Sequence, residues 1–139
     1  KGTPEVLTAT STGEVDASVE ILGPALPQIR AGNVKALAVT SSRRFSALPD
    51  VPTVAESGLP GYQAASWNGI AAPAGTPRPV IERLVKEIHA AVAHPEVKAR
   101  LLELGVVAQS GTPESTRKLL ESDIAKWGAV IEKAGIEKQ

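Results

Sequence analysis

The sequence predicts an α/β fold in which short β-α-β elements are followed by longer helices. Before Trp67, apolar residues form short alternating or continuous runs between proline- and glycine-rich turns, which is typical of strands and short helices around a sheet. After Trp67, apolar residues recur at helical spacing over longer segments. The 139 residues suffice for one modest domain or two small lobes.

The first elements predict a helix followed by a β-α-β unit. A helix is expected to start at Gly2–Glu5, with Thr3 as the N-cap, and to end by Gly13. Glu14–Ile21 alternate between apolar and polar residues and predict a strand. A short helix over Pro24–Ala31, with Pro27 in its first turn, leads to a compact apolar strand over Lys35–Thr40, so the unit forms a right-handed crossover.

The remaining elements are mostly helical. They are one helical turn within Asp50–Gly58, a strand over Trp67–Ala72, helices over Pro79–Val92 and from Pro95 to Gly105, a short strand over Val106–Ala108, and a last helix from the N-cap Thr112 to Gly135. These strands are few for a self-sufficient sheet. We therefore expect the chain to share a sheet with absent sequence or with another subunit.

Composition excludes several classes of function. The 15 basic and 15 acidic residues cancel, so the chain has no electrostatic footprint for nucleic acid. It has no cysteine, which excludes disulfides, thiolate nucleophiles and sulfur metal ligands. Its apolar runs are shorter than the about 20 residues of a membrane span. Because the chain has no methionine, Lys1 is not a translational start and upstream sequence is expected.

Few residues are candidates for catalysis. His89 and His94 lack acidic or sulfur partners at metal-ligand spacing, which favours structural roles and predicts no metal site or cofactor. Glu14, Asp16 and Glu20 share the polar face of a predicted strand, where solvated carboxylates are the simpler interpretation. A hydrolase or transferase using these carboxylates would need a histidine within about 3.2 Å of one of them.

Two features could bind an anion. Arg43 and Arg44 form a basic pair, although Arg44 is better explained as holding its loop through Asp50 or Glu56. The first helix presents free N–H groups and the positive end of its dipole at Gly2-Thr3, which suits a carboxylate. Every helix has such an end, so this observation alone does not define a site.

The Leu48–Tyr62 segment resembles the most recognisable motif of the Bug family of extracytoplasmic receptors, the TctC-like substrate-binding components of tripartite tricarboxylate transporters. The resemblance covers essentially all 139 residues, because further segments agree in order and spacing. These segments are Lys1-Gly-Thr-Pro4, Gly13-Glu-Val-Asp16, Ile29-Arg-Ala-Gly32 followed by Lys35–Thr40 and Arg44, Trp67-x-Gly69, Ala72-Pro-Ala-Gly-Thr-Pro77, and Ala134-Gly-Ile136 after Trp127.

The resemblance implies a periplasmic-binding-protein-like (Venus flytrap) architecture of two α/β lobes, incomplete in this chain. Residues 1–62 would be part of lobe two, and residues 63–139 would cross back and complete lobe one. The family's amino-terminal half, with its signal peptide and first-lobe carboxylate loop, has no counterpart here. Such a receptor is not an enzyme: it captures a small organic acid or acidic amino acid in the periplasm and delivers it to a membrane permease.

The resemblance also implies the ligand-binding residues. The second-lobe ligand loop falls on Gly2 and Thr3, with Lys1 beside it. The family's polar residue after the Gly-x-Val-Asp strand falls near Glu20, where many relatives carry aspartate or a small polar group. The longer glutamate would alter which ligands fit. The alternative function is a self-associating interaction module without ligand binding, which exposed sheet edges would favour.

Overall fold

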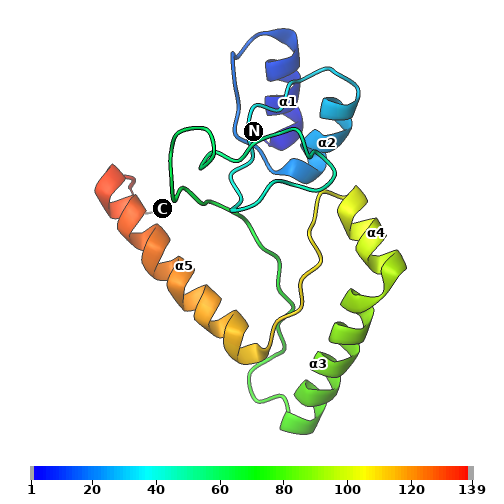
Figure 1. Cartoon of the computed structure of the whole chain (residues 1–139). Helices are drawn as coiled ribbons and strands as arrows, with labels where there is room; N and C mark the ends of the chain where they lie inside the picture. Colours follow the sequence, from blue (N-terminus) through cyan, green and yellow to red (C-terminus); the bar gives the residue numbers. More distant parts are fainter. Residues whose placement is uncertain (1, 138–139) are drawn as a thin grey trace. The chain divides into compact units, whose positions relative to one another are not determined.

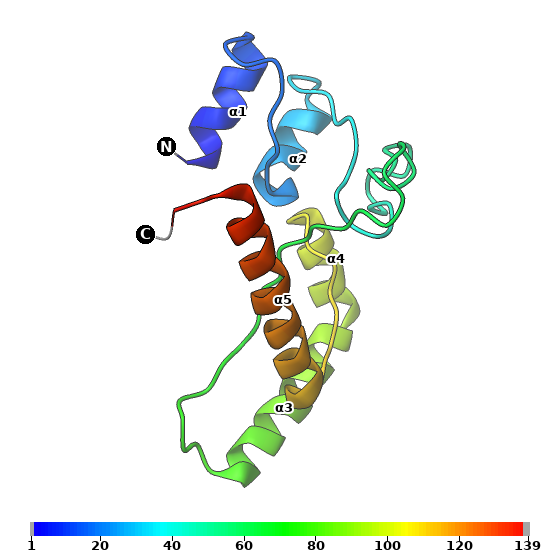
Figure 2. The same ribbon diagram turned by 90° about the vertical axis from the view of Figure 1, so that its left-hand side faces the viewer.

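The computed structural model describes residues 2–137 (Figures 1 and 2). Its helices are α1 (Thr3–Thr12), α2 (Leu22–Arg30), α3 (Arg78–Ala93), α4 (Pro95–Glu103) and α5 (Pro113–Ala134). The chain divides into two compact units, one of Lys1–Asn68 with Pro95–Ala108 and one of Gly69–His94 with Gln109–Gln139. The lobe boundary expected at residue 62 stays a prediction.

Helix α1 begins one residue earlier than the sequence indicated. Gly2, with φ −103° and ψ 177°, is the N-cap, so the prediction of Thr3 as the cap is wrong and Thr3 is the first helical residue. The extended backbone of Gly2 suits the position before a helix. Pro4 is tolerated in the first turn because no N–H is needed there. The predicted end is confirmed, since Gly13 adopts a left-handed φ of 77° after Thr12.

Helix α2 also starts earlier than expected, at Leu22. Pro27 is therefore inside the helix rather than in its first turn, and the carbonyl of Gly23 loses the N–H that an ordinary residue would donate to it. The predicted end is confirmed: Gly32 has a φ of 76°, and the Asn33 N–H donates to the Gln28 carbonyl at 3.0 Å. This bond closes the last turn as in a Schellman motif.

Two glycines allow the start of α2 to meet the turn that ends α4. A Cβ built on Gly23 would lie 2.6 Å from the Leu104 carbonyl oxygen, and one built on Gly105 would lie 2.7 Å from Cα and N of Gly23. Backbone therefore packs directly on backbone at this point. Gly105 also needs its φ of 76°, which side chains rarely adopt. This contact holds α4 within the first unit.

The predicted strands are not formed in the part of the chain that the structure describes. The segments Glu14–Ile21, Lys35–Thr40, Trp67–Ala72 and Val106–Ala108 are irregular or extended, so these strand predictions are wrong for this chain by itself. The β-pairing that does form among the described residues is one parallel bridge between Val39 and Thr53. A strand needs a neighbouring strand along its length for its backbone hydrogen bonds, and among the described residues such bonds are confined to Val39 and Thr40 at the end of one segment.

The carboxyl-terminal helices agree with the sequence. Thr112 is the N-cap of α5, as predicted: its Oγ1 accepts from the Ser115 N–H at 3.1 Å, and the Ser115 hydroxyl oxygen accepts from the Thr112 N–H at 2.8 Å. Gly135, with φ 65°, ends α5. His94 is the C-cap of α3 at the junction with Pro95, which confirms its structural role.

The described residues bury little apolar surface. The buried apolar side chains among them are all in the first unit: Leu7, Ala25, Leu26 and Phe45. The solvent-accessible area is 10918 Å², whereas two separate folded domains of half this mass would together expose about 8,200 Å². The chain thus presents large apolar faces to solvent. None of the described helices is long and apolar enough to cross a membrane.

Candidate functional site

The predicted carboxylate site at the start of α1 is open on the surface. Gly2 is exposed and Thr3 is half-buried. The Thr3 N–H lies at the first helical position, where no preceding turn offers it an acceptor. Pro4 has no N–H to contribute. This end of the helix can therefore present the amides of Gly2 and Thr3 to an anion, aided by the helix dipole.

Sequence reasoning missed a competitor for one of these donors. The Glu5 carboxylate accepts a hydrogen bond from the Gly2 N–H at 2.9 Å. This bond is the glutamate half of a capping box. Glu5 lies three residues after the N-cap Gly2, and this spacing could have predicted the bond from the sequence. A ligand carboxylate that used the Gly2 amide would have to displace Glu5, whereas the Thr3 amide needs no such exchange.

The other two predicted site residues are not joined to this end of α1. Glu20 is half-buried and lies directly before Ile21, the N-cap of α2. Among residues 2–137, no hydrogen bond or ion pair links Glu20 to Gly2 or Thr3. Lys1 lies outside the described residues. The structure therefore presents the helix end and Glu20 as separate features of the first unit.

A hollow of about 250 Å³ lies between α1 and α2, the helix pair that packs most extensively in the described chain. Its lining includes Leu7 and Pro24 and the polar side chains of Thr8, Ser11 and Gln28. The two hydroxyls already donate to helix carbonyls, Thr8 to that of Pro4 and Ser11 to that of Thr8. Neither hydroxyl is then a donor for a carboxylate. The Gln28 side chain accepts from the Asn33 amide through its Oε1 at 2.7 Å, so its Nε2 is the neutral donor that an anion in this hollow could use.

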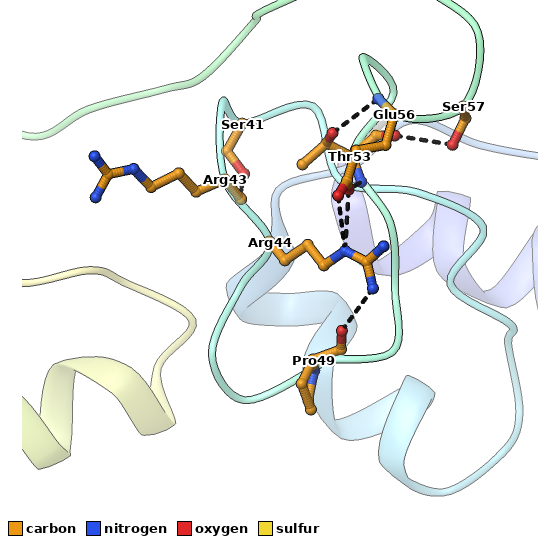
Figure 3. A network of polar contacts seen from close by, with 7 residues as sticks. All are labelled: Ser41, Arg43, Arg44, Pro49, Thr53, Glu56 and Ser57. Carbon is orange, nitrogen blue, oxygen red and sulfur yellow. Dashed lines mark hydrogen bonds and ion pairs between the residues drawn. The ribbon is translucent and has the colours of Figure 1, made fainter.

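A polar cluster holds Arg44 against the Leu48–Tyr62 segment (Figure 3). The Arg44 Nε donates to both carboxylate oxygens of Glu56, at 3.2 and 3.0 Å, and its Nη1 donates to the Pro49 carbonyl at 3.1 Å. Glu56 also accepts from the Thr53 N–H at 2.7 Å, while the Thr53 hydroxyl accepts from the Glu56 N–H at 3.1 Å. The prediction that Arg44 holds its loop is confirmed, with Glu56 as its partner.

The same contacts set the ionisation of Glu56. The hydrogen bond from the Thr53 backbone, followed by that from Arg44, lowers the pKa of the Glu56 carboxyl below its ordinary value.

The Ser57 N–H donates to the Thr53 carbonyl at 3.1 Å, which is the bond of a single helical turn and confirms the turn predicted here. The Thr53 and Glu56 pair is thus a capping box on one turn.

Because Arg44 is engaged, it is not available for an external anion. In Figure 3 the guanidinium of Arg43 points away from the cluster. The backbone carbonyl of Arg43 accepts a hydrogen bond from the Ser41 hydroxyl at 2.7 Å. Arg43 borders a broad surface hollow of about 570 Å³ beside Pro60 and Gly61. A single exposed guanidinium beside an open hollow gives a bound anion little geometric definition.

The two histidines belong to the second unit, whereas the candidate carboxylates belong to the first. His89 Nε2 lies 2.8 Å from the Gly111 carbonyl oxygen and so links α3 to the segment before α5. In the described chain no hydrogen bond or ion pair joins either histidine to Glu14, Asp16 or Glu20, and no group of residues there could hold a metal ion.

Comparison with known proteins identifies the fold of the chain. Its fold is that of part of a periplasmic binding protein. It aligns with an R. palustris protein solved with adipate at a TM-score of 0.84 and 33% identity, covering 97% of this chain and 45% of that one. MatC from Rhodopseudomonas palustris with bound malate aligns at a TM-score of 0.77 and 35% identity, with 94% and 45% of the two chains covered.

A family model described as the tripartite tricarboxylate transporter family receptor matches residues 1–136. Among curated relatives, a UPF0065 protein in the tcbD-tcbE intergenic region of a Pseudomonas species is 39% identical over 94% of this chain and 39% of its own length. BugT of Bordetella pertussis is 33% identical over 97% of this chain and 41% of its own.

The chain belongs to the tripartite tricarboxylate transporter receptor family, as the sequence resemblance predicted. Members of this family are periplasmic binding receptors and not enzymes. The chain spans less than half the length of each of the relatives and solved structures described above.

Proposed function

We propose that this chain is the carboxyl-terminal portion of a periplasmic receptor that captures a small carboxylate and delivers it to a transporter permease. The observation that carries the proposal is the open amino-terminal end of α1 in a chain of this receptor family. Two solved structures similar to it hold adipate and malate, which are both dicarboxylates. Exposed helix amides suit the charge and hydrogen-bonding capacity of such ligands.

The ligand would be held from this side by the amides of Gly2 and Thr3, with the ammonium of Lys1 beside them. Charge-assisted hydrogen bonds to a carboxylate strengthen when water is excluded, as in a closing cleft. Glu20 would repel a second carboxylate that came near it. It would therefore favour a ligand that also carries an ammonium group, such as a free acidic amino acid, over a plain dicarboxylate of the same length.

The rest of the binding site would come from polypeptide outside this chain. The apolar faces that α3 and α5 present to solvent support this proposal, because neither helix has a buried residue. In this arrangement residues 1–62 belong to the second lobe, and residues 63–139 return to complete the first. Periplasmic location and permease partnership follow the family to which the chain belongs.

Amide NMR titration of the 139-residue chain with adipate and malate tests the proposal. The Gly2 and Thr3 cross-peaks should shift with ligand, and adipamide, the uncharged analogue of adipate, should leave them unchanged. A Thr3→Pro variant removes the amide at a position where proline is favoured, so the helix stays and the response is lost. Thr3→Ser is the matched control, because it keeps the amide. Shifts confined to the Arg43 region, or no shift with either ligand, would contradict the proposal.

A second function, self-association without ligand binding, is favoured by a different observation. The chain exposes large apolar side chains in both units, among them Val19, Leu37 and Ile124, which are 89%, 68% and 64% exposed. Its net charge of zero provides no long-range repulsion between copies. Light scattering over a concentration series separates this function from that of a ligand-binding monomer.

A further inference from the structure

The Asn68-Gly69 dipeptide lies in a stretch of the chain without regular structure. Both residues are exposed, and the next side chain, Ile70, is 78% exposed. Among residues 2–137, no hydrogen bond engages the Asn68 side chain or the backbone N–H of Gly69. The side-chain amide of Asn68 and the backbone nitrogen that follows it are therefore both free to react.

An asparagine side chain can react with the next backbone nitrogen when that nitrogen is free. After the Gly69 N–H gives its proton to water, the nitrogen attacks Cγ of Asn68 and the Cγ–Nδ2 bond breaks. Ammonia leaves with a proton from water, and the new N–Cγ bond closes a five-membered succinimide ring. Water then opens the ring at one of its two carbonyl carbons, which leaves aspartate or isoaspartate. The whole reaction consumes one water and releases one ammonia.

Two features of the dipeptide favour this reaction. Glycine has no Cβ, so nothing crowds the attacking nitrogen, and its backbone reaches conformations that other residues rarely adopt. The segment Trp67–Ala72 is irregular, so no strand ladder holds the Asn68 side chain away from that nitrogen. We propose that Asn68 is a site of spontaneous deamidation through a succinimide formed with Gly69. The proposal does not rest on carboxylate capture, because neither residue is among the proposed ligand-binding residues.

The other asparagine of the chain is held in a way that opposes the same reaction. Asn33 Nδ2 donates to Gln28 Oε1 at 2.7 Å, and the Asn33 N–H donates to the Gln28 carbonyl at 3.0 Å. The next residue is Val34, whose branched side chain crowds the backbone nitrogen that would attack. Asn33 is therefore expected to stay intact and serves as the internal control.

Deamidation changes both the charge and the covalent length of the chain. The new carboxylate is ionised at neutral pH, so the formal net charge falls from zero to minus one. Isoaspartate carries the main chain through its side chain and lengthens it by one methylene group. Asn68 is the last residue of the first segment of one compact unit and Gly69 begins the other, so this connection is the part that lengthens.

Ageing of the 139-residue chain in a mildly alkaline buffer tests the proposal. Isoelectric focusing should show a new band below the parent pI of about 7.0, and peptide mass spectrometry should find aspartate and isoaspartate at position 68. The rate should match that of a synthetic peptide of residues 64–73 within about threefold, because a mobile segment opens at almost no cost in free energy. A folded chain slower than the peptide by more than this factor, or conversion at Asn33 in place of Asn68, would overturn the proposal.

Two variants verify the chemistry. Gly69→Ala keeps the Asn68 amide but places a Cβ beside the attacking nitrogen, so the acidic band should form several-fold more slowly. Asn68→Gln should abolish the band, because the longer side chain would have to close a six-membered ring. Both positions are exposed, and circular dichroism should show unchanged helices. Formation of the band at the parent rate in either variant would show that the succinimide at Asn68 is not its source.

Discussion

Replacing Gly23 by alanine tests the close contact between α2 and the turn after α4. The new Cβ would lie 2.6 Å from the Leu104 carbonyl oxygen, closer than real Cβ contacts come. Because the obstacle is backbone, it cannot rotate away as a side chain would. Overpacking of this kind costs about 1–3 kcal/mol, and the better helix propensity of alanine returns at most about 1 kcal/mol. After the full propensity gain is subtracted, we expect a net loss of stability of up to about 2 kcal/mol.

The matched control is Gly128→Ala in α5, where a Cβ would meet nothing within 4 Å. There the same substitution should stabilise by up to about 1 kcal/mol, because only the helix propensity changes. Thermal unfolding followed by far-ultraviolet circular dichroism measures both variants, and the difference in stability should appear as about 4–8 °C in Tm per kcal/mol. A Gly23→Ala protein stabilised as much as Gly128→Ala would refute the close contact between α2 and the turn after α4.

Three further predictions concern single hydrogen-bonded groups. The hydrogen bond from the Thr53 backbone lowers the pKa of Glu56 below its ordinary 4.5. The stability that the ionised Glu56 contributes should be fully present above that pH and should be lost as the pH falls through the lower folded-state pKa. Glu56→Gln should therefore make the urea midpoint depend less on pH in this range than it does in the parent protein. Thr112→Ala should cost about 0.5–2 kcal/mol of helix stability by circular dichroism, with Thr112→Ser restoring most of it. Glu5→Gln should strengthen the adipate response of the Gly2 amide in NMR titrations, because a neutral side chain competes less for that donor; an unchanged response would show that Glu5 does not compete.

Sequence reasoning succeeded where a structure depends on neighbours in the chain. The sequence predicted the Thr112 cap, the glycine ends at Gly13, Gly32 and Gly135, and the attachment of Arg44 to a nearby carboxylate, since each partner lies within about twelve positions. It left Asp50 and Glu56 open as the partner of Arg44, and the structure selects Glu56. Helix starts were less certain, because proline fits several first-turn positions equally well. That ambiguity explains the one-residue error at Thr3 and the two-residue error at α2.

The candidate site could be predicted only in part. The open end of α1 follows from local sequence, but the occupation of the Gly2 amide by Glu5 depends on which residue is the cap. With Thr3 as the cap, Glu5 would have been the second helical residue and could not have been assigned the reciprocal bond. Whether Glu20 approaches Gly2 and Thr3 depends on how Glu14–Ile21 pair, which the local sequence does not determine.

The strand errors and the exposed helices have one physical cause. A helix satisfies its backbone within itself, so α3 and α5 form although they bury no side chain. A strand obtains its hydrogen bonds from another segment, so Glu14–Ile21 and Trp67–Ala72 stay irregular without one. The extended segments therefore lack a neighbouring strand, and the two helices keep apolar rows exposed. Backbone amides of Glu14–Ile21 should accordingly exchange with solvent faster than those in the middle of α3 and α5.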